Sequence, residues 1–190
     1  IQTNTEKVVN ILKENNFIDE IHSENSIDYN FTHMGKLASY IAEAHPLVLS
    51  QLCENLDYFN EYNSKQIVGI LSCFVDIKVS DDMKQLIPKC SDSEVTRAVY
   101  MIEDIINKYA DSEDQNHIWT GYNYEDALQY DLMELSMEWC SKNNEQDCKY
   151  FIQDSVYEKE ISIGDFNKAL LKIVTMAKEL SNICEDIGQI

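Results

Sequence analysis

The chain has 190 residues, of which 44% are hydrophobic and 10% are aromatic, so it can bury a core and is not a disordered chain. Five glycines and two prolines are too few for the frequent turns of an all-β sandwich or barrel. The formal net charge of −19 excludes a general nucleic-acid coat or a binder of anionic membranes, because both need a basic surface.

The apolar spacing of the first half of the chain predicts helices over residues 5–16, 34–44, 47–53 and a stretch that begins near 64. Thr32 and Ser64 are suitable N-caps, and Pro46 fits the first turn of a helix. The polar stretch 20–30 is expected to be a loop, with a short extended piece near 27–31.

In the second half of the chain, helices are predicted over residues 94–109, 124–140, 145–155 and 164–187. The acidic segment 111–122 is expected to be an exposed loop. The last helix should pack through an apolar seam of Phe166, Leu170, Ile173, Ala177, Leu180, Cys184 and Ile187. The predicted fold class is all-α: one compact helical bundle over 1–190 with a long C-terminal helix and at most a small extended element near its start.

The six cysteines form no C-x-x-C pair, so we expect free thiols in a reducing, intracellular compartment, the cytoplasm or the nucleus. No apolar run approaches 18 residues, and no secretory signal is visible, so no membrane partner is expected. The chain begins at Ile1 rather than at Met, and we expect it to be a fragment of a longer protein.

Two short motifs invite a nucleotide-binding interpretation and fail. Residues 19–22 spell the D-E-x-H box of a helicase motor, but only 18 residues precede them and those predict a helix, so a polar loop is expected. Gly35 and Lys36 lack the glycine and the Ser/Thr of a phosphate loop, because Asn30 and Leu37 stand at those places. The sequence therefore predicts no cofactor in this chain.

The histidines and cysteines do not form a recognisable reactive site. His22, His33, His45 and His117 are far apart and form no H-x-x-x-H pair, so no metal site is predicted. A Cys–His nucleophile pair stays open as an alternative, although structural cysteines are favoured. We predict no catalytic residue.

The last helix differs from the rest of the chain in charge. Residues 162–190 carry three lysines and four acidic residues, whereas the whole chain carries 15 basic and 34 acidic ones. Asp165, Lys168 and Lys172 share one helical face, predicted to lie opposite much of the apolar seam. Two interpretations stay open: a solvated stripe with an Asp165–Lys168 pair, or a narrow cationic line that contacts the phosphates or bases of a strand.

Four stretches follow one another in a recognisable order. They are 31–38 running into 43–47 (F-T-H-M-G-K-L-A … E-A-H-P-L), 66–75 ending in I-L-S-C-F-V, 131–133 followed by 139–140 (D-L-M … W-C), and 164–171 followed by 187–188. Together they resemble the DSHCT domain, the helical C-terminal domain of SKI-type DExH RNA helicases that feed the RNA exosome. The resemblance covers about residues 17–188. The motif G-D-F-x-K-A indicates a divergent, viral branch of the family.

The resemblance implies a role rather than a reaction. In the family, two RecA-like motor domains use ATP and Mg²⁺ to pull single-stranded RNA in the 3′→5′ direction, and the helical domain packs on the motor and lines the channel. The resemblance implies that Lys168 and Asp76 lie near the RNA. Lys172 and Asp165 share the helical face of Lys168 and complete the predicted RNA-binding residues. The family's arginine is Lys168 in this chain, which keeps the charge but loses the planar fork, and its glutamate before the motif glycine is Ile163.

The resemblance further implies that the parent chain is an ATP-hydrolysing RNA helicase, with an exosome-type partner, and that this piece has no ATPase of its own. The alternative is a free-standing helical interaction module, such as a viral adaptor that binds a host peptide in a groove.

Overall fold

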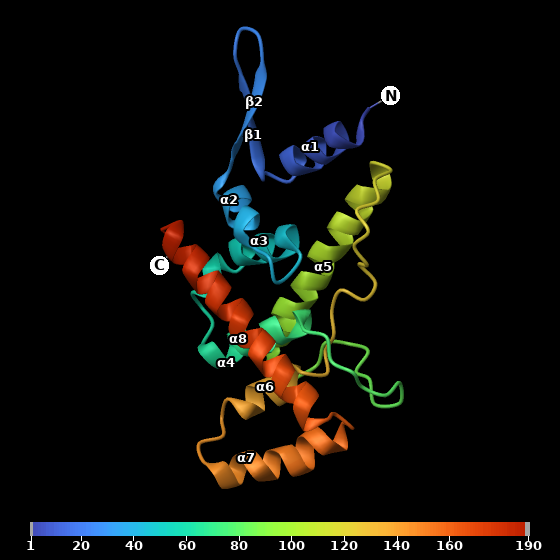
Figure 1. Cartoon of the computed structure of the whole chain (residues 1–190), viewed down its shortest axis with the longest axis vertical. Coiled ribbons are helices and arrows are strands. Elements are labelled where there is room, and N and C mark those ends of the chain that lie inside the picture. The colour runs from blue at the N-terminus through green and yellow to red at the C-terminus, as the bar shows by residue number, and fades with distance from the viewer. Residues whose placement is uncertain (1, 189–190) are drawn as a thin grey trace.

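The computed structural model describes residues 2–188, so the predicted domain of 1–190 extends beyond the described part at both ends. Helices dominate it (Figure 1). The elements in chain order are α1 (Asn4–Glu14), β1 (Ile18–His22), β2 (Ile27–Phe31), α2 (His33–Tyr40), α3 (Pro46–Asn55), α4 (Ser64–Leu71), α5 (Ser93–Gln115), α6 (Met133–Trp139), α7 (Glu145–Phe151) and α8 (Ile163–Asp186). Single 3-10 turns span Asp57–Phe59 and Ser72–Phe74, and a π-helical turn over Ile152–Val156 continues α7.

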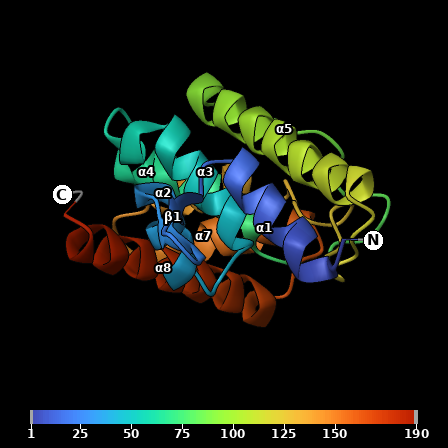
Figure 2. The same cartoon turned by 90° about the horizontal axis from the view of Figure 1, so that it is seen from above.

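The two long helices, α5 and α8, lie on opposite sides of the body, as the view from above shows (Figure 2). The shorter helices α3 and α4 fill the space between them, and α4 contacts both α5 and α8. The hairpin of β1 and β2 projects from one end of the molecule, and α7 crosses the other end (Figure 1). The core therefore lies between the two long helices α5 and α8.

Helix α8 is the element that the sequence predicted best, because its boundaries agree with the expected 164–187 to within one residue. The side chain of Ser162 caps it by accepting the Asp165 N–H at 3.1 Å. The fully buried face differs from the predicted seam: Leu170, Ala177, Cys184 and Ile187 are only half-buried at its flank. The buried residues are Phe166, Ala169, Ile173, Met176, Leu180 and Ile183.

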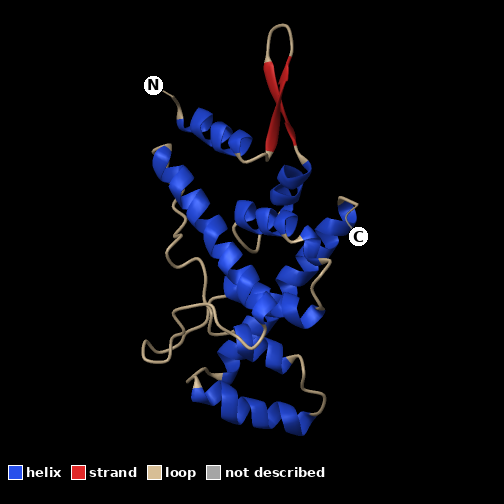
Figure 3. Cartoon of the chain, turned by 180° about the vertical axis from the view of Figure 1, so that it is seen from behind, coloured by secondary structure: helices blue, strands red, loops and turns tan. Residues whose placement is uncertain are grey.

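The all-α fold class is confirmed only in part, because the helical body carries a small antiparallel hairpin. The extended piece expected near 27–31 is confirmed as β2, whereas residues 20–22, expected to be loop, belong to β1. Ile18 pairs with Phe31 and His22 pairs with Ile27 (Figure 3, red strands). Apolar and polar residues alternate along β2, which is the period of a strand. Only Ile18 of the ten strand residues is buried, so the hairpin carries little of the core.

The helix predicted over 124–140 exists only as α6, because tertiary hydrogen bonds hold the preceding residues in a non-helical path. Gln129 donates its N–H to the Cys73 carbonyl at 3.0 Å, and its side-chain Oε1 accepts the Ile77 N–H at 2.9 Å. Helix α5, in contrast, is longer than predicted. It continues to Gln115 and includes the start of segment 111–122, which was expected to be a loop.

Two other helix ends differ from expectation for local reasons. Helix α2 ends at Tyr40 rather than near 44, since the N–H groups of Ala42 and Glu43 donate to Glu179 of α8. The N-cap of α4 is Asn63 rather than Ser64, and it forms a reciprocal capping box with Gln66. The N-cap predicted at Thr32 and the first-turn position predicted for Pro46 are confirmed, and the N-cap of α3 is His45.

Candidate nucleic-acid interface

A groove of about 520 Å³ lies between the first half of α8 and the extended segment 74–78 that follows α4. All four residues singled out from the sequence line it. Its lining residues are Glu43, Phe74, Val75, Asp76, Ile77, Lys78, Asp165, Lys168, Ala169 and Lys172. The structure thus brings Asp76 to the same site as three residues that are about 90 positions away in the chain.

Alternating burial explains how segment 74–78 presents its charged residues. Val75 and Ile77 are buried in the core, so Asp76 and Lys78 point outward from an extended backbone. On the opposite side of the groove, Lys168 and Lys172 are exposed and Ala169 between them is buried. The small alanine leaves room for a groove between the two elements.

Lys168 and Lys172 border the buried face of α8. The prediction that they lie opposite the apolar seam is therefore wrong. Lys168 and Lys172 flank Ala169, which is 3% exposed and belongs to the core. Residues three and four positions apart share a helical face, so both lysines lie at the margin where α8 meets the body. This position places their ammonium groups in a groove instead of on an open surface.

Of the two interpretations left open for this helical face, a free cationic line does not hold at Lys172, which forms an ion pair with Glu43. The predicted Asp165–Lys168 pair is also absent, since no ion pair joins these two side chains in the described residues. Within residues 2–188, neither Lys168 nor Lys78 has a carboxylate within ion-pair distance. These are the two groove cations available to an external anion.

The charge of the groove differs from that of the molecule. Its lining carries three lysines and three carboxylates, on a chain of formal net charge −19. A locally balanced groove repels a polyanion much less than the surrounding surface does. The three lysines and three carboxylates of the lining balance, so the groove opposes a polyanion with no net charge of its own.

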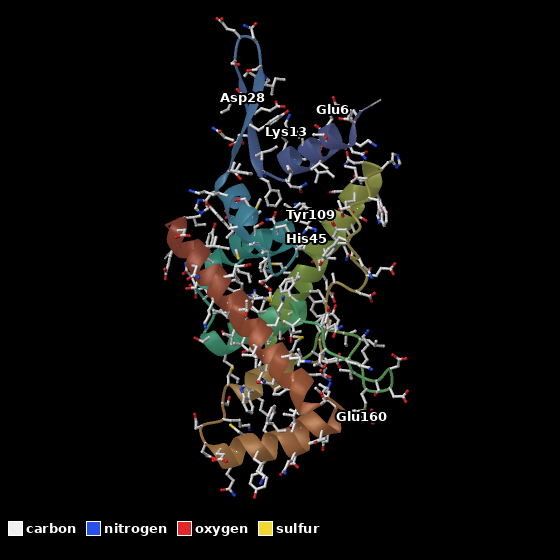
Figure 4. The ribbon with its side chains drawn as sticks, viewed as in Figure 1. Glu6, Lys13, Asp28, His45, Tyr109 and Glu160 are labelled. Atoms are coloured by element: carbon white, nitrogen blue, oxygen red, sulfur yellow. The ribbon has the colours of Figure 1, made fainter. Side chains whose placement is uncertain are left out.

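A second cavity, of about 710 Å³, adjoins the groove and shares Glu43, Phe74 and Asp76 with it. His45, at the start of α3, lies beside Tyr109 of α5 (Figure 4). Tyr122 contacts His45 edge-on with ring centroids 4.5 Å apart, and Tyr124 lies 4.8 Å from Tyr122. Four aromatic rings thus form one wall of this cavity.

A chain of hydrogen bonds fixes this wall. The Val48 N–H donates to Nδ1 of His45 at 3.4 Å, which leaves Nε2 to donate to the Tyr124 hydroxyl at 3.2 Å. The Tyr124 hydroxyl and that of Thr120 both donate to Glu113 Oε1, at 3.0 and 2.7 Å. Burial lowers the pKa of His45 and the charge of Glu113 opposes this, so the ring is neutral at pH 7.

The cysteines do not provide a nucleophile next to either cavity. All six are free thiols, and burial raises the pKa of Cys53, Cys73, Cys140 and Cys184 above the ordinary value. A raised pKa keeps a thiol protonated and weakly nucleophilic. In residues 2–188 no group of three or more His, Cys, Asp or Glu is placed to hold a metal ion.

Sequence reasoning missed Glu43, Lys78 and the aromatic wall. Glu43 and His45 belong to one of the stretches that carried the resemblance, but nothing in the sequence indicated which lysine Glu43 would meet. Lys78 lies two residues from Asp76, and the alternating apolar pattern Val75–Ile77 was the signal that could have found it.

The family model of the DSHCT (NUC185) domain matches residues 28–189 of the chain. No curated protein matches the sequence of this chain. The helices of the described part are each too short or too polar to cross a membrane.

Proposed function

Since the chain belongs to the DSHCT domain family, we propose that it is the C-terminal accessory domain of an ATP-dependent 3′→5′ RNA helicase. In this role it packs on the two RecA-like motor domains and lines the path of single-stranded RNA. ATP and Mg²⁺ act in the motor domains, and the domain itself has no ATPase. An exosome-type complex is the proposed partner of the whole helicase.

The observation that carries the proposal is the groove along α8. It gathers Lys168 and Lys78, which have no ion-pair partner within residues 2–188, on a chain of formal net charge −19. The unpaired ammonium groups can contact phosphates, while Asp76 and Asp165 can accept hydrogen bonds from base amino groups or from 2′-hydroxyls. Lysine contacts of this kind position a strand without selecting its sequence.

Binding by the isolated domain should be weak and sensitive to salt. Two or three lysine–phosphate contacts on a single strand correspond to a slope of log K against log salt of about −1.4 to −2. The strong net negative charge adds a general repulsion that salt reduces. The contacts with phosphates make binding weaker as salt rises, while screening of this repulsion makes the slope shallower. In the helicase, the motor domains supply the remaining contacts.

The test compares Lys168→Glu with Lys178→Glu, two charge reversals of exposed lysines on the same helix. Lys178 does not line the groove and has no ion-pair partner in the described chain. The probe is a fluorescein-labelled 12-nucleotide uridine RNA at low salt. Lys168→Glu should weaken binding about tenfold, the equivalent of about 1.4 kcal/mol. The loss of binding free energy in Lys178→Glu should be less than half of that value. Equal effects of the two variants would contradict the proposed groove contact.

In the full helicase, Lys168→Glu should affect the unwinding rate without affecting the stability of the domain. Lys168→Glu is expected to slow unwinding of a 3′-tailed duplex and to leave the melting temperature of the domain unchanged, because Lys168 is exposed and makes no ion pair in the described part. Normal unwinding by this variant would show that the strand does not pass Lys168.

A further inference from the structure

The cavity beside the groove has an apolar floor that its own chain leaves partly uncovered. Its volume is about 710 Å³, which is within the range of pockets that bind small molecules or peptide side chains. The apolar lining comes from five parts of the fold. They are α1 (Val8, Ile11 and Leu12), the start of α3 (Ala44, Pro46 and Leu47), and three separate segments that contribute Phe74, Ile118 and Ala127.

The charged residues of the cavity are all of one sign. Its lining holds the carboxylates of Glu43, Asp76, Glu113 and Asp126 and contains no lysine or arginine. Glu43 is neutralised by Lys172, but the other three form no ion pair within the described part of the chain. These three carboxylates therefore give the cavity a negative charge that would attract a cationic ligand.

The aromatic wall gives this cavity a second preference for cations. Tyr122 and Tyr124 present two accessible phenol rings beside the ring of His45, and the buried ring of Tyr109 lies next to His45. The faces of such rings attract a guanidinium or an ammonium group, and the attraction increases when the cation is partly removed from water. The fold already shows one such contact, since Lys108 Nζ lies 5.5 Å from the centre of the Tyr109 ring.

We propose that this cavity binds a basic, apolar peptide segment of a protein partner, with an arginine side chain against the tyrosine wall and between Glu113 and Asp126. The flanking apolar side chains of the peptide cover Leu12 and Leu47 on the floor. Arginine fits better than lysine because its planar group can stack on a ring and donate to two carboxylates at once. RNA fits less well, because the three unpaired carboxylates repel phosphates.

The proposal is tested with a defined probe, a fluorescein-labelled peptide of sequence Gly-Leu-Arg-Leu-Arg-Leu-Gly. A matched peptide carries citrulline, the uncharged isostere, in place of both arginines. The arginine peptide should bind with Kd below about 1 mM at 50 mM salt, and the citrulline peptide at least tenfold more weakly. A Kd above that limit, or equal binding of both peptides, would overturn the proposal.

Conservative variants locate the binding site. Glu113→Gln and Asp126→Asn remove charge but retain a side-chain oxygen that can accept the bonds from Thr120, Tyr124 and Asn123. Each should weaken the arginine peptide about three- to fivefold. The control is Glu61→Gln, which removes an exposed carboxylate outside the cavity and should leave the Kd unchanged. Equal effects of all three would place the binding elsewhere.

A nuclear magnetic resonance titration decides between peptide and RNA. The arginine peptide should shift the backbone amide signals of residues 118–127, whereas the uridine 12-mer should shift those of 74–78 and of the first half of α8. If the RNA shifts 118–127 and the peptide does not, the cavity binds nucleobases and the peptide proposal is overturned. The RNA affinity of Lys168→Glu is a separate readout, so this proposal and the proposed function fail independently.

Discussion

Lys172 of α8 forms an ion pair with Glu43, which lies in the segment that joins α2 to α3. Glu179, about two turns further along α8, accepts the N–H groups of Ala42 and Glu43 at 3.2 and 3.3 Å. These contacts hold the segment against α8. Because Glu43 lines both the groove and the cavity, it forms the boundary between a mixed-charge surface and an acidic one.

Removing the charge of Glu43 should increase the affinity of the groove for RNA. Glu43→Gln frees the Lys172 ammonium and removes one of three groove carboxylates, so binding of the uridine 12-mer should become about three- to fivefold tighter at 50 mM salt. The measurement is fluorescence anisotropy, with Glu61→Gln as the control. The gain should shrink at 300 mM salt, and a gain that persists there would not be electrostatic.

Gly35 is required by a close approach of two backbone segments. A Cβ at this position would lie 1.8 Å from the carbonyl oxygen of Phe17, which itself accepts the Thr32 N–H. Gly35→Ala should therefore lower the free energy of unfolding by about 3 kcal/mol or more, measured by urea denaturation.

The matched control for Gly35→Ala is Gly164→Ala, in the first turn of α8. There the added Cβ would meet nothing closer than the Ser162 Oγ at 4.0 Å. Alanine favours the helix, so stability should stay unchanged or rise by up to about 1 kcal/mol. Similar losses at both glycines would contradict the close contact at Phe17.

Asp131 should be a stability determinant, because it is a buried carboxylate that ties three segments together. It is 2% exposed, accepts the Gln85 N–H at 2.8 Å and lies 3.5 Å from Lys159 Nζ. Asp131→Ala leaves the Gln85 N–H without its partner and should cost about 1–3 kcal/mol.

Asp131→Asn separates the hydrogen bond from the ion pair. The amide oxygen can still accept from Gln85, so this variant should lose less stability than Asp131→Ala. Urea titrations of both variants provide the measurement. If the alanine variant unfolds at the same midpoint as the parent, Asp131 does not support the fold in this way.

Acid should destabilise the domain partly through His45. Burial places its pKa in the folded chain below the ordinary value of 6.5, so the unfolded chain takes up the proton first as the pH falls. Linkage then requires that the contribution of neutral His45 is complete above about pH 6.5 and is lost as the pH drops toward the folded pKa.

His45→Asn isolates this effect, since asparagine is a good N-cap and does not titrate. The difference between the free energies of unfolding at pH 7 and pH 5 should be smaller in this variant than in the parent. His117→Asn, at an exposed position just after α5 with no ion pair within residues 2–188, is the control and should keep the parent's difference. An identical pH dependence in all three proteins would exclude His45 as a contributor.

The sequence predicted those helices in which apolar periodicity and capping agree. Helix α8 combines a Ser162 cap with six buried residues at three- and four-residue spacing, and its boundaries were predicted almost correctly. Residues 124–130 show the opposite case. Leu128 continued a helical pattern, but Gln129 donates to the Cys73 carbonyl and accepts from the Ile77 N–H, and these bonds to a distant segment override the pattern. Local patterns do not contain such long-range competition.

The sequence predicted the part of the candidate site that lies on one helix, but not the contacts between separate elements. Asp165, Lys168 and Lys172 share a face because helix geometry alone places them together. The pairing of Lys172 with Glu43, and the meeting of His45, Tyr124 and Glu113, depend on how separate elements pack. The residues of the aromatic wall are distributed over positions 45 to 124, and no spacing rule connects them.

The projecting hairpin has a consequence for how the molecule opens. Two strands without a third are marginally stable in water, and Ile27, Tyr29 and Phe31 on one side of β2 are 54%, 44% and 64% exposed. Few side chains resist separation of β1 from β2, so amide protons of this arm should exchange with deuterium long before those in the middle of α5. The chain therefore divides into a slowly exchanging body and a rapidly exchanging arm.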